Sequence, residues 1–223
     1  MPTNTPKVKI NGIKKYGANL ILFGETYDEA ERKAKELARK DGCAYISPYN
    51  DELIIAGHGT IGIEIIEALP NIDTVMVPLG GGGLLSGISI AVKSLRSNVQ
   101  VIGVQSKSSP VMYESLKAGK IVDVQKASTL SIAEGLSGNV GPITFKIVQK
   151  CVDRIILVKE ETLRHAVYLL WKYDKQVVEG SGAAAVAPIM DNKPLFEGKT
   201  VVSVVTGGNI DSNLFQSILG SER

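Results

Sequence analysis

The sequence predicts an α/β protein with a parallel sheet and helices on both faces of that sheet. Short β-branched segments alternate along the chain with longer segments that have helical spacing. The short segments are apolar throughout, as expected for strands that are buried on both faces. One of them runs into four glycines and then an apolar helix, in the stretch VPLGGGGLLSG at 77–87. With 223 residues, 44% of them hydrophobic, the chain is long enough to bury a core in one or two domains.

The elements expected before residue 50 are a helix over 6–16, a strand over 18–23, a helix over 26–41 and a strand over 43–47. Thr26 and Glu29 have the spacing of a capping box, which marks a helix start. Gly17 and Gly42 follow the two helices and are typical of helix ends.

The later part of the chain continues the alternation of strands and helices. Strands are expected over 74–79, 99–104, 154–158 and 200–208, and helices over 60–69, 84–95, around 147–152, from Glu160 onward and over 181–190. The denser apolar strands all follow Asn50, so we predict two domains, 1–50 and 51–223.

Composition excludes several classes of function. The net charge is +2, from 25 basic and 23 acidic residues, without a basic block for binding nucleic acid. No apolar stretch approaches the roughly 18 residues that span a membrane, and the N-terminus has no secretory signal. Cys43 and Cys151 have no metal or redox spacing. We therefore expect a reduced, cytoplasmic protein without a nucleic-acid or membrane partner.

The four glycines predict an anion site. Free N–H groups at a helix start point outward, the helix dipole favours an anion, and glycine removes the Cβ that blocks close approach. The motif G-x-G-x-x-G fails in every register across 80–87, and no lysine follows until Lys93, so dinucleotides and nucleoside triphosphates are disfavoured. A small phosphate dianion fits better; the alternative is a tight turn that binds nothing.

Several segments together resemble fold-type II pyridoxal-phosphate enzymes, in the threonine dehydratase and serine racemase branch. These are TPKVKINGIKKYGANLILFG (5–24), ISPYNDELIIAGHGTIGIEI (46–65), VPLGGGGLLSGISIAVKSL (77–95), VIGVQS (101–106), IAEGLSG (132–138), VVEGSGAAAVA (177–187) and VVTGGNID (204–211). The resemblance covers nearly the whole chain. It implies pyridoxal 5′-phosphate as the cofactor and a hydroxy amino acid, threonine or serine, as the substrate.

The resemblance assigns roles to particular residues. The cofactor-binding positions it implies are Gly80, Gly81, Gly82, Gly83, Leu84, Gly135, Glu179 and Thr206. The amides of 80–84 would hold the phosphate, and Gly135 would pack against the ring. Thr206 would place its hydroxyl opposite the pyridine nitrogen, where relatives usually have serine. Glu179 would face the cofactor or substrate, unless it is only a carboxylate at a helix start.

Two features of the family are not found in this sequence. Racemase-like relatives bind a cation at positions matching Gln105, Ser109 and Val111; because valine cannot ligate a metal and acids are missing, we predict no metal. The Schiff-base lysine of the family belongs to a motif upstream of residue 1, so the catalytic residues are unknown. The chain thus resembles the C-terminal two-thirds of such an enzyme, with a sheet incomplete at its N-terminal side.

The expected function is threonine or serine dehydration to a 2-oxo acid and ammonia, by a homo-oligomer. Two alternatives stay open. The chain could be a non-catalytic module that holds phosphate at 80–84, or it could resemble serine racemase in activity.

Overall fold

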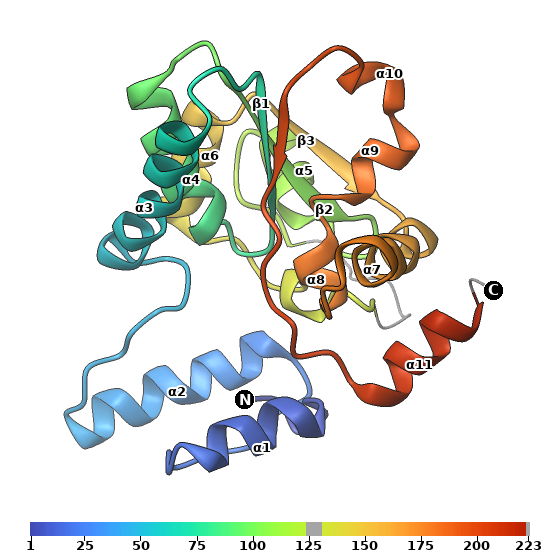
Figure 1. Ribbon diagram of the computed structural model, residues 1–223. Helices are drawn as coiled ribbons and strands as arrows, with labels where there is room; N and C mark the ends of the chain where they lie inside the picture. Colours follow the sequence, from blue (N-terminus) through green and yellow to red (C-terminus); the bar gives the residue numbers. More distant parts are fainter. Residues whose placement is uncertain (124–130, 222–223) are drawn as a thin grey trace.

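A four-stranded parallel sheet forms the centre of the protein. The computed structural model describes residues 1–123 and 131–221. The strands are β1 (Thr74–Pro78), β2 (Gln100–Ser106), β3 (Arg154–Val158) and β4 (Val201–Ser203), in the order β3-β2-β1-β4 (Figure 1). Every neighbouring pair is parallel, and Val75 of β1 pairs with Val101 on one side and Val202 on the other.

Helices cover both faces of this sheet, as predicted. In Figure 1, α3 (Glu52–Ala68), α4 (Gly83–Leu95) and α6 (Pro142–Cys151) lie on one side, and α7 (Glu160–Asp174), α8 (Gly180–Ala183) and α9 (Ala187–Asp191) on the other. Successive residues of β1 pack alternately against the helices on one face of the sheet and those on the other. Val75 and Val77 pack with Leu85 of α4, whereas Met76 packs with Leu163 and Val167 of α7. All six of these apolar side chains are fully buried, so the parallel sheet is apolar on both faces.

The remaining elements are short or peripheral. They are α1 (Lys7–Lys15), α2 (Tyr27–Asp41), α5 (Val111–Ala118), the 3₁₀ turn η1 (Glu134–Leu136), α10 (Lys193–Phe196) and α11 (Ser212–Ser221). Helices α1 and α2 lie together, beyond one end of the sheet (Figure 1). Helix α11 reaches α7 through the only tryptophan of the sequence, Trp171, whose ring meets that of Phe215 edge-on at a centroid distance of 6.4 Å. None of the helices in the described ranges has the length and hydropathy to span a bilayer.

The capping box is confirmed, but the two strands predicted before residue 50 are wrong. The Thr26 hydroxyl accepts from Glu29 N at 3.3 Å, and the Glu29 carboxylate accepts from Thr26 N at 3.1 Å. Residues 18–23 and 43–47 form no strand. Residues 18–23 are hydrogen-bonded to Met1, with Phe23 N donating to Met1 O at 2.9 Å, and this apolar segment pairs with none of the four strands.

Four boundaries also differ from those predicted, and one of them is the start of α6, at Pro142 instead of near residue 147. Helix α3 begins at Glu52 instead of Thr60, because the carboxylate of Asp51 accepts from Leu53 N and Ile54 N. The helix expected over 181–190 is divided into α8 and α9, where Pro188 lacks the N–H that would continue it. Strand β4 pairs only over 201–203.

Helices α3 and α4 cross in close contact through glycines. A β-carbon on Gly62 would lie 2.9 Å from the Ile88 carbonyl oxygen and from the Ala91 side chain. One on Gly87 would overlap the Ile55 carbonyl oxygen. Because this crossing is tight, the N-terminus of α4 and the loop before it are held in a fixed position against α3.

Candidate functional site

The glycine loop joins the carboxyl end of β1 to the N-terminus of α4. Leu79 N donates to Val104 O at 2.8 Å, and Ser86 N donates to Gly82 O at 2.9 Å, so the loop is anchored at both ends. Between these anchors, the described residues offer no hydrogen-bond acceptor to the backbone N–H groups of residues 80–84. A row of such donors at a helix start is suited to an anion.

Crowding explains part of the glycine content of this loop. Gly82 has φ +95°, a left-handed conformation that L side chains rarely adopt. A β-carbon on Gly80 would lie 2.8 Å from the carbonyl oxygen of Gly135, and one on Gly81 would lie 2.6 Å from the ring of Tyr49. One on Gly83 would lie 2.7 Å from the Tyr49 Cα. Packing therefore demands glycine here, and the free N–H groups are the separate observation that indicates a ligand.

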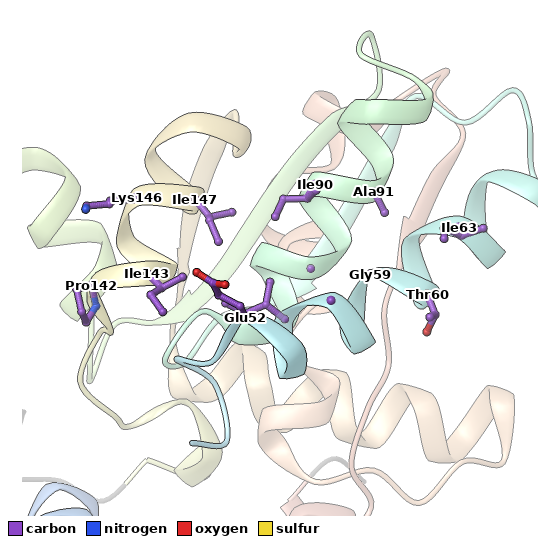
Figure 2. Close-up of a pocket in the computed structure, with 13 residues that line it drawn as sticks. Glu52, Gly59, Thr60, Ile63, Ile90, Ala91, Pro142, Ile143, Lys146 and Ile147 are labelled. Atoms are coloured by element: carbon purple, nitrogen blue, oxygen red, sulfur yellow. The ribbon is translucent and has the colours of Figure 1, made fainter. Parts of the chain in front are cut away.

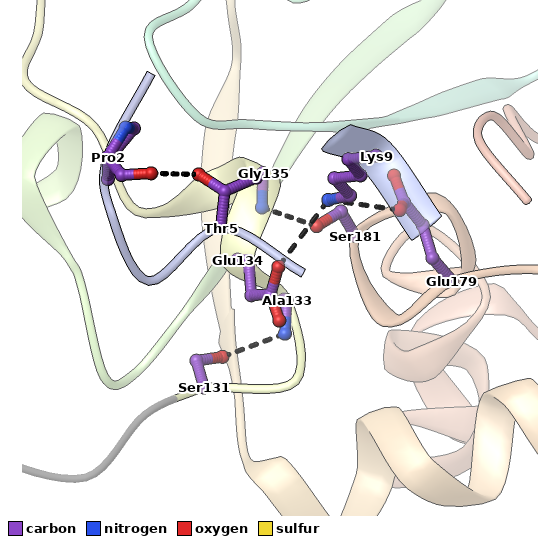
Figure 3. Close-up of polar contacts among 9 residues, drawn as sticks. All are labelled: Pro2, Thr5, Lys9, Ser131, Ala133, Glu134, Gly135, Glu179 and Ser181. Carbon is purple, nitrogen blue, oxygen red and sulfur yellow. Dashed lines mark hydrogen bonds and ion pairs between the residues drawn. The ribbon is translucent and has the colours of Figure 1, made fainter. Parts of the chain in front are cut away.

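Gly135 lies directly beside the glycine loop. It belongs to η1, and its N–H donates to the Ser181 hydroxyl at 2.9 Å (Figure 3). The close approach of Gly80 to the Gly135 carbonyl joins this turn to the loop. Ser181 lies in α8, so one hydrogen bond connects the start of α8 with the turn that carries Gly135.

Glu179 and the segment 206–208 complete the cluster. Glu179 N donates to Gly207 O at 2.9 Å, and a β-carbon on Gly207 would lie 2.6 Å from Glu179 Oε1. Thr206 N donates to Gly182 O at 3.3 Å, and Thr206 itself is exposed. The structure thus brings the glycine loop, Gly135, Glu179 and Thr206 into one chain of contacts, through Ser181 and Gly182 of α8.

Three residues at this cluster were assigned no role from the sequence. Thr144 Oγ donates to Gly81 O at 2.7 Å, Asn50 Oδ1 accepts from Ile143 N at 2.9 Å, and the Tyr49 ring covers Gly81. Tyr49 and Asn50 fall within the stretch ISPYNDELIIAGHGTIGIEI, one of those that resemble the family. This resemblance is the one sequence feature that could have indicated their place at the site. Burial and the carboxylates of Glu31 and Asp28 raise the pKa of Tyr49 to about 12.

The carboxylate of Glu160 holds the segment that leads to Gly135. It accepts from Ser131 Oγ at 2.6 Å, Ser108 Oγ at 3.0 Å and Ile132 N at 2.9 Å. Ser131 Oγ in turn accepts from Ala133 N at 3.0 Å. These hydrogen bonds fix residues 131–133, and with them the turn that follows, against the carboxyl ends of β2 and β3.

The positions considered for a cation lie in the interior. Gln105 is fully buried, its Oε1 accepts from Tyr113 N at 3.1 Å, and its Nε2 has no hydrogen-bond partner among the described residues. Ser109 is buried as well, and no residue of the ranges 1–123 and 131–221 forms a hydrogen bond with its hydroxyl. Within 1–123 and 131–221, no three His, Cys, Asp or Glu side chains are grouped as metal ligands. That the site holds no metal stays a prediction.

A separate cavity of about 710 Å³ lies on the outer side of α3, α4 and α6 (Figure 2). Most of its lining side chains are apolar, among them Ile63, Ile90, Ile143 and Ile147. Two charged side chains, those of Glu52 and Lys146, also line it. It does not include the glycine loop.

A family model described as "Pyridoxal-phosphate dependent enzyme" matches residues 1–207. The chain belongs to this family. The resemblance seen in the sequence is therefore confirmed, and so is pyridoxal phosphate as the cofactor of the family. The predicted fold class, a parallel α/β sheet of the fold-type II pyridoxal-phosphate enzymes, is confirmed as well.

Relatives of this pyridoxal-phosphate family agree along nearly the whole chain. The L-threonine ammonia-lyase of Thermotoga maritima is 43% identical over 220 residues, which are 98% of this chain and 54% of that protein. The catabolic L-threonine dehydratase TdcB of Escherichia coli K12 is 38% identical, over 99% of this chain and 67% of that protein. The chain thus spans about half to two-thirds of the length of these relatives.

Solved structures of the family are similar in fold. The processed form of threonine deaminase isoform 2 from Solanum lycopersicum has a TM-score of 0.90 at 34% identity, covering 99% of this chain and 61% of that one. Maize serine racemase has a TM-score of 0.88 at 30% identity, covering 99% of this chain and 68% of that one.

Proposed function

We propose that this chain binds pyridoxal 5′-phosphate and forms part of a threonine or serine dehydratase. The observation that carries the proposal is the row of free N–H groups over 80–84, which adjoins Gly135 on one side. These donors would hold the phosphate, and Gly135 would pack against the ring. Glu179 and Thr206 would flank the opposite side of the ring. The relatives named as L-threonine ammonia-lyase and L-threonine dehydratase support the substrate class.

The residues present fit this cofactor. A doubly charged phosphate matches several unpaired N–H groups at the N-terminus of α4, where the helix dipole favours an anion. When bound, pyridoxal phosphate supplies an electron sink for removing the α-proton and the β-hydroxyl of an amino acid. Thr206 offers the pyridine nitrogen a neutral hydroxyl, which stabilises positive charge less than a carboxylate does. A weaker sink suits elimination, because elimination needs less charge delocalisation than transamination.

We further propose that residues 1–50 and 51–223 are separate domains, and that the protein is cytoplasmic and homo-oligomeric. Two unpaired cysteines, Cys43 and Cys151, support a reducing compartment. The exposed apolar cavity beside α3, α4 and α6 supports contact with a second copy of the chain.

The experiment is a titration of the purified 223-residue chain with 4′-deoxypyridoxine 5′-phosphate, followed by calorimetry. This probe keeps the ring and phosphate but has no aldehyde, so it cannot modify surface lysines. We expect saturable binding in a 1:1 ratio, competition by pyridoxal phosphate, and at least about tenfold weaker binding of unphosphorylated 4′-deoxypyridoxine. Equal affinity with and without the phosphate would overturn the assignment of residues 80–84.

A second experiment tests whether these 223 residues catalyse the dehydration on their own or act alone as a non-catalytic phosphate-binding module. The chain is mixed with pyridoxal phosphate, reduced with borohydride and analysed by mass spectrometry, and ammonia release from threonine is measured in parallel. Phosphate binding without a lysine adduct or ammonia shows that these 223 residues alone bind phosphate but do not catalyse the reaction, as expected if the Schiff-base lysine lies upstream of residue 1. An adduct on a single lysine together with threonine-dependent ammonia shows that the chain carries its own catalytic lysine.

Serine racemase activity is the other candidate, supported by the similarity to maize serine racemase. Conversion of L-serine to D-serine, detected by chiral chromatography, would favour it over the dehydratase.

A further inference from the structure

Lys9 lies between two carboxylates at the rim of the candidate site. Its Nζ is 3.3 Å from Glu179 Oε2 and 3.5 Å from Glu134 Oε2 (Figure 3). The three side chains come from different segments, α1, the start of α8 and η1. The Lys9 side chain is 26% exposed and the Glu179 side chain is 18% exposed, so water screens the charges of this pair only in part.

Both carboxylates adjoin residues that would flank the cofactor ring. Glu134 directly precedes Gly135, whose carbonyl oxygen is in contact with Gly80 of the glycine loop. Glu179 is in contact with Gly207, the residue that follows Thr206. Glu179 therefore contacts the residue next to Thr206, whose hydroxyl would face the pyridine nitrogen.

The charge near a pyridine nitrogen decides whether that nitrogen is protonated. A carboxylate that approaches it stabilises the pyridinium form, whereas a neutral hydroxyl beside it does not. Without a cation, Glu134 and Glu179 would place two negative charges beside this position, and with Lys9 the cluster carries a single one. The position of the Glu179 carboxylate relative to the pyridine nitrogen would therefore influence whether this nitrogen is protonated.

We propose that Lys9 is a positioning residue that draws the carboxylates of Glu134 and Glu179 away from the ring, so that the Thr206 hydroxyl is the polar partner of the pyridine nitrogen. The inference rests on the proposed function, because it requires the ring to lie beside Gly135 and Thr206. Lys9 touches neither ring nor substrate in this scheme; it acts through the two glutamates.

The rest of α1 supports a specific role for Lys9. This helix has no buried residue, and within the described part of the chain none of its other side chains forms an ion pair or hydrogen bond. Lys7, Lys14 and Lys15 point into solvent. One lysine of four is thus directed at the site, and Lys14 on the same helix offers a matched control.

The test measures the ¹⁵N chemical shift of 4′-deoxypyridoxine 5′-phosphate, labelled at the pyridine nitrogen and bound to the full chain at neutral pH. We expect Lys9→Met to shift the resonance towards that of the protonated probe. Lys9→Arg and Lys14→Met should leave it at the wild-type position. Because the freed Glu179 causes the shift, the double variant Lys9→Met/Glu179→Gln should return the resonance towards the wild-type position.

The outcomes separate this inference from the proposed function. If the wild-type chain does not bind the probe, the proposed function fails first. If the probe binds, but Lys9→Met changes only its affinity and leaves the resonance in place, Lys9 is merely a structural contact and the inference is overturned. Circular dichroism of each variant establishes that it is folded, and Lys9→Gln, which also removes the positive charge, takes the place of Lys9→Met if that variant does not fold.

Discussion

Gly82 and Gly83 are neighbours, yet each requires glycine for a different reason. Gly82 adopts φ +95°, so a side chain there would strain the backbone whatever space surrounds it. At Gly83, a β-carbon would meet the backbone of Tyr49, at 2.7 Å from its Cα. A backbone atom cannot move aside as a flexible side chain can, so Gly83 couples the loop to the segment before α3.

Gly83→Ala should therefore weaken both stability and ligand binding. Pushing Tyr49 away costs about 1–3 kcal/mol, as overpacking usually does, and displaces the N–H groups of the loop. We expect a lower melting temperature and at least about tenfold weaker binding of 4′-deoxypyridoxine 5′-phosphate by calorimetry. The control is Gly138→Ala, where a β-carbon meets nothing within 4 Å. Unchanged binding in Gly83→Ala would contradict the close contact.

Tyr49 predicts a loss of stability at high pH. Its pKa is raised from 10.0 to about 12 by burial and then by Glu31 and Asp28, whereas in the unfolded chain it ionises near 10.0. The unfolded state thus releases its proton first, so the stability present below pH 10 is lost as pH rises towards 12.

The measurement is a denaturant titration at several alkaline pH values, with tyrosinate absorbance recorded alongside. Tyr49→Phe keeps the ring over Gly81 but cannot ionise, so its stability should fall less steeply with pH. Identical slopes for both proteins would argue against a buried Tyr49.

At the scale of elements, α3 contains glycines with opposite environments. Gly57 has nothing within 4 Å of its β-carbon position, while Gly62 faces Ile88 and Ala91 of α4. Gly57→Ala should raise the free energy of unfolding by about 0.5–1 kcal/mol, because alanine favours helix. Gly62→Ala should lower it by about 1–3 kcal/mol, because α4 must move. Urea denaturation of this pair compares the two; stabilisation by both substitutions would show that the helices do not cross so closely.

The sequence predicted most closely those elements whose composition agrees with their place in the four-stranded sheet. The apolar runs of β1, β2 and β3, the helix α4 and the start of α7 were placed within two residues, since both their composition and their partners agree. Residues 18–23 and 43–47 are also rich in apolar side chains, but a strand exists only with a neighbour to bond, and sequence cannot reveal that neighbour.

The candidate site shows the same division. The glycine loop was predicted because its spacing and its place between strand and helix are local properties. The contacts of Lys9 with Glu134 and Glu179, and of Tyr49 with Gly81, join segments far apart in the sequence. Neither residue type nor spacing along one chain identifies such pairs.

At the scale of the whole molecule, the apolar cavity predicts self-association. Ile63 and Ile90 line it and are 43% and 41% exposed. If a second copy covers this surface, Ile90→Glu should raise the dissociation constant of the oligomer by tenfold or more, because a buried unpaired charge costs at least about 1.4 kcal/mol. Sedimentation equilibrium measures this constant. Tyr173→Glu, at a 71% exposed position on α7 across the sheet, is the control. An unchanged constant for Ile90→Glu would place the contact elsewhere.

The edge-on contact between the rings of Trp171 and Phe215 makes Trp171 an intrinsic fluorescence probe of the C-terminal helix. No other indole contributes to the emission, so release of the C-terminal helix into water would appear as a red shift and a change of intensity. Fluorescence compared with far-ultraviolet dichroism during denaturation would then show whether that helix departs before the sheet melts or together with it.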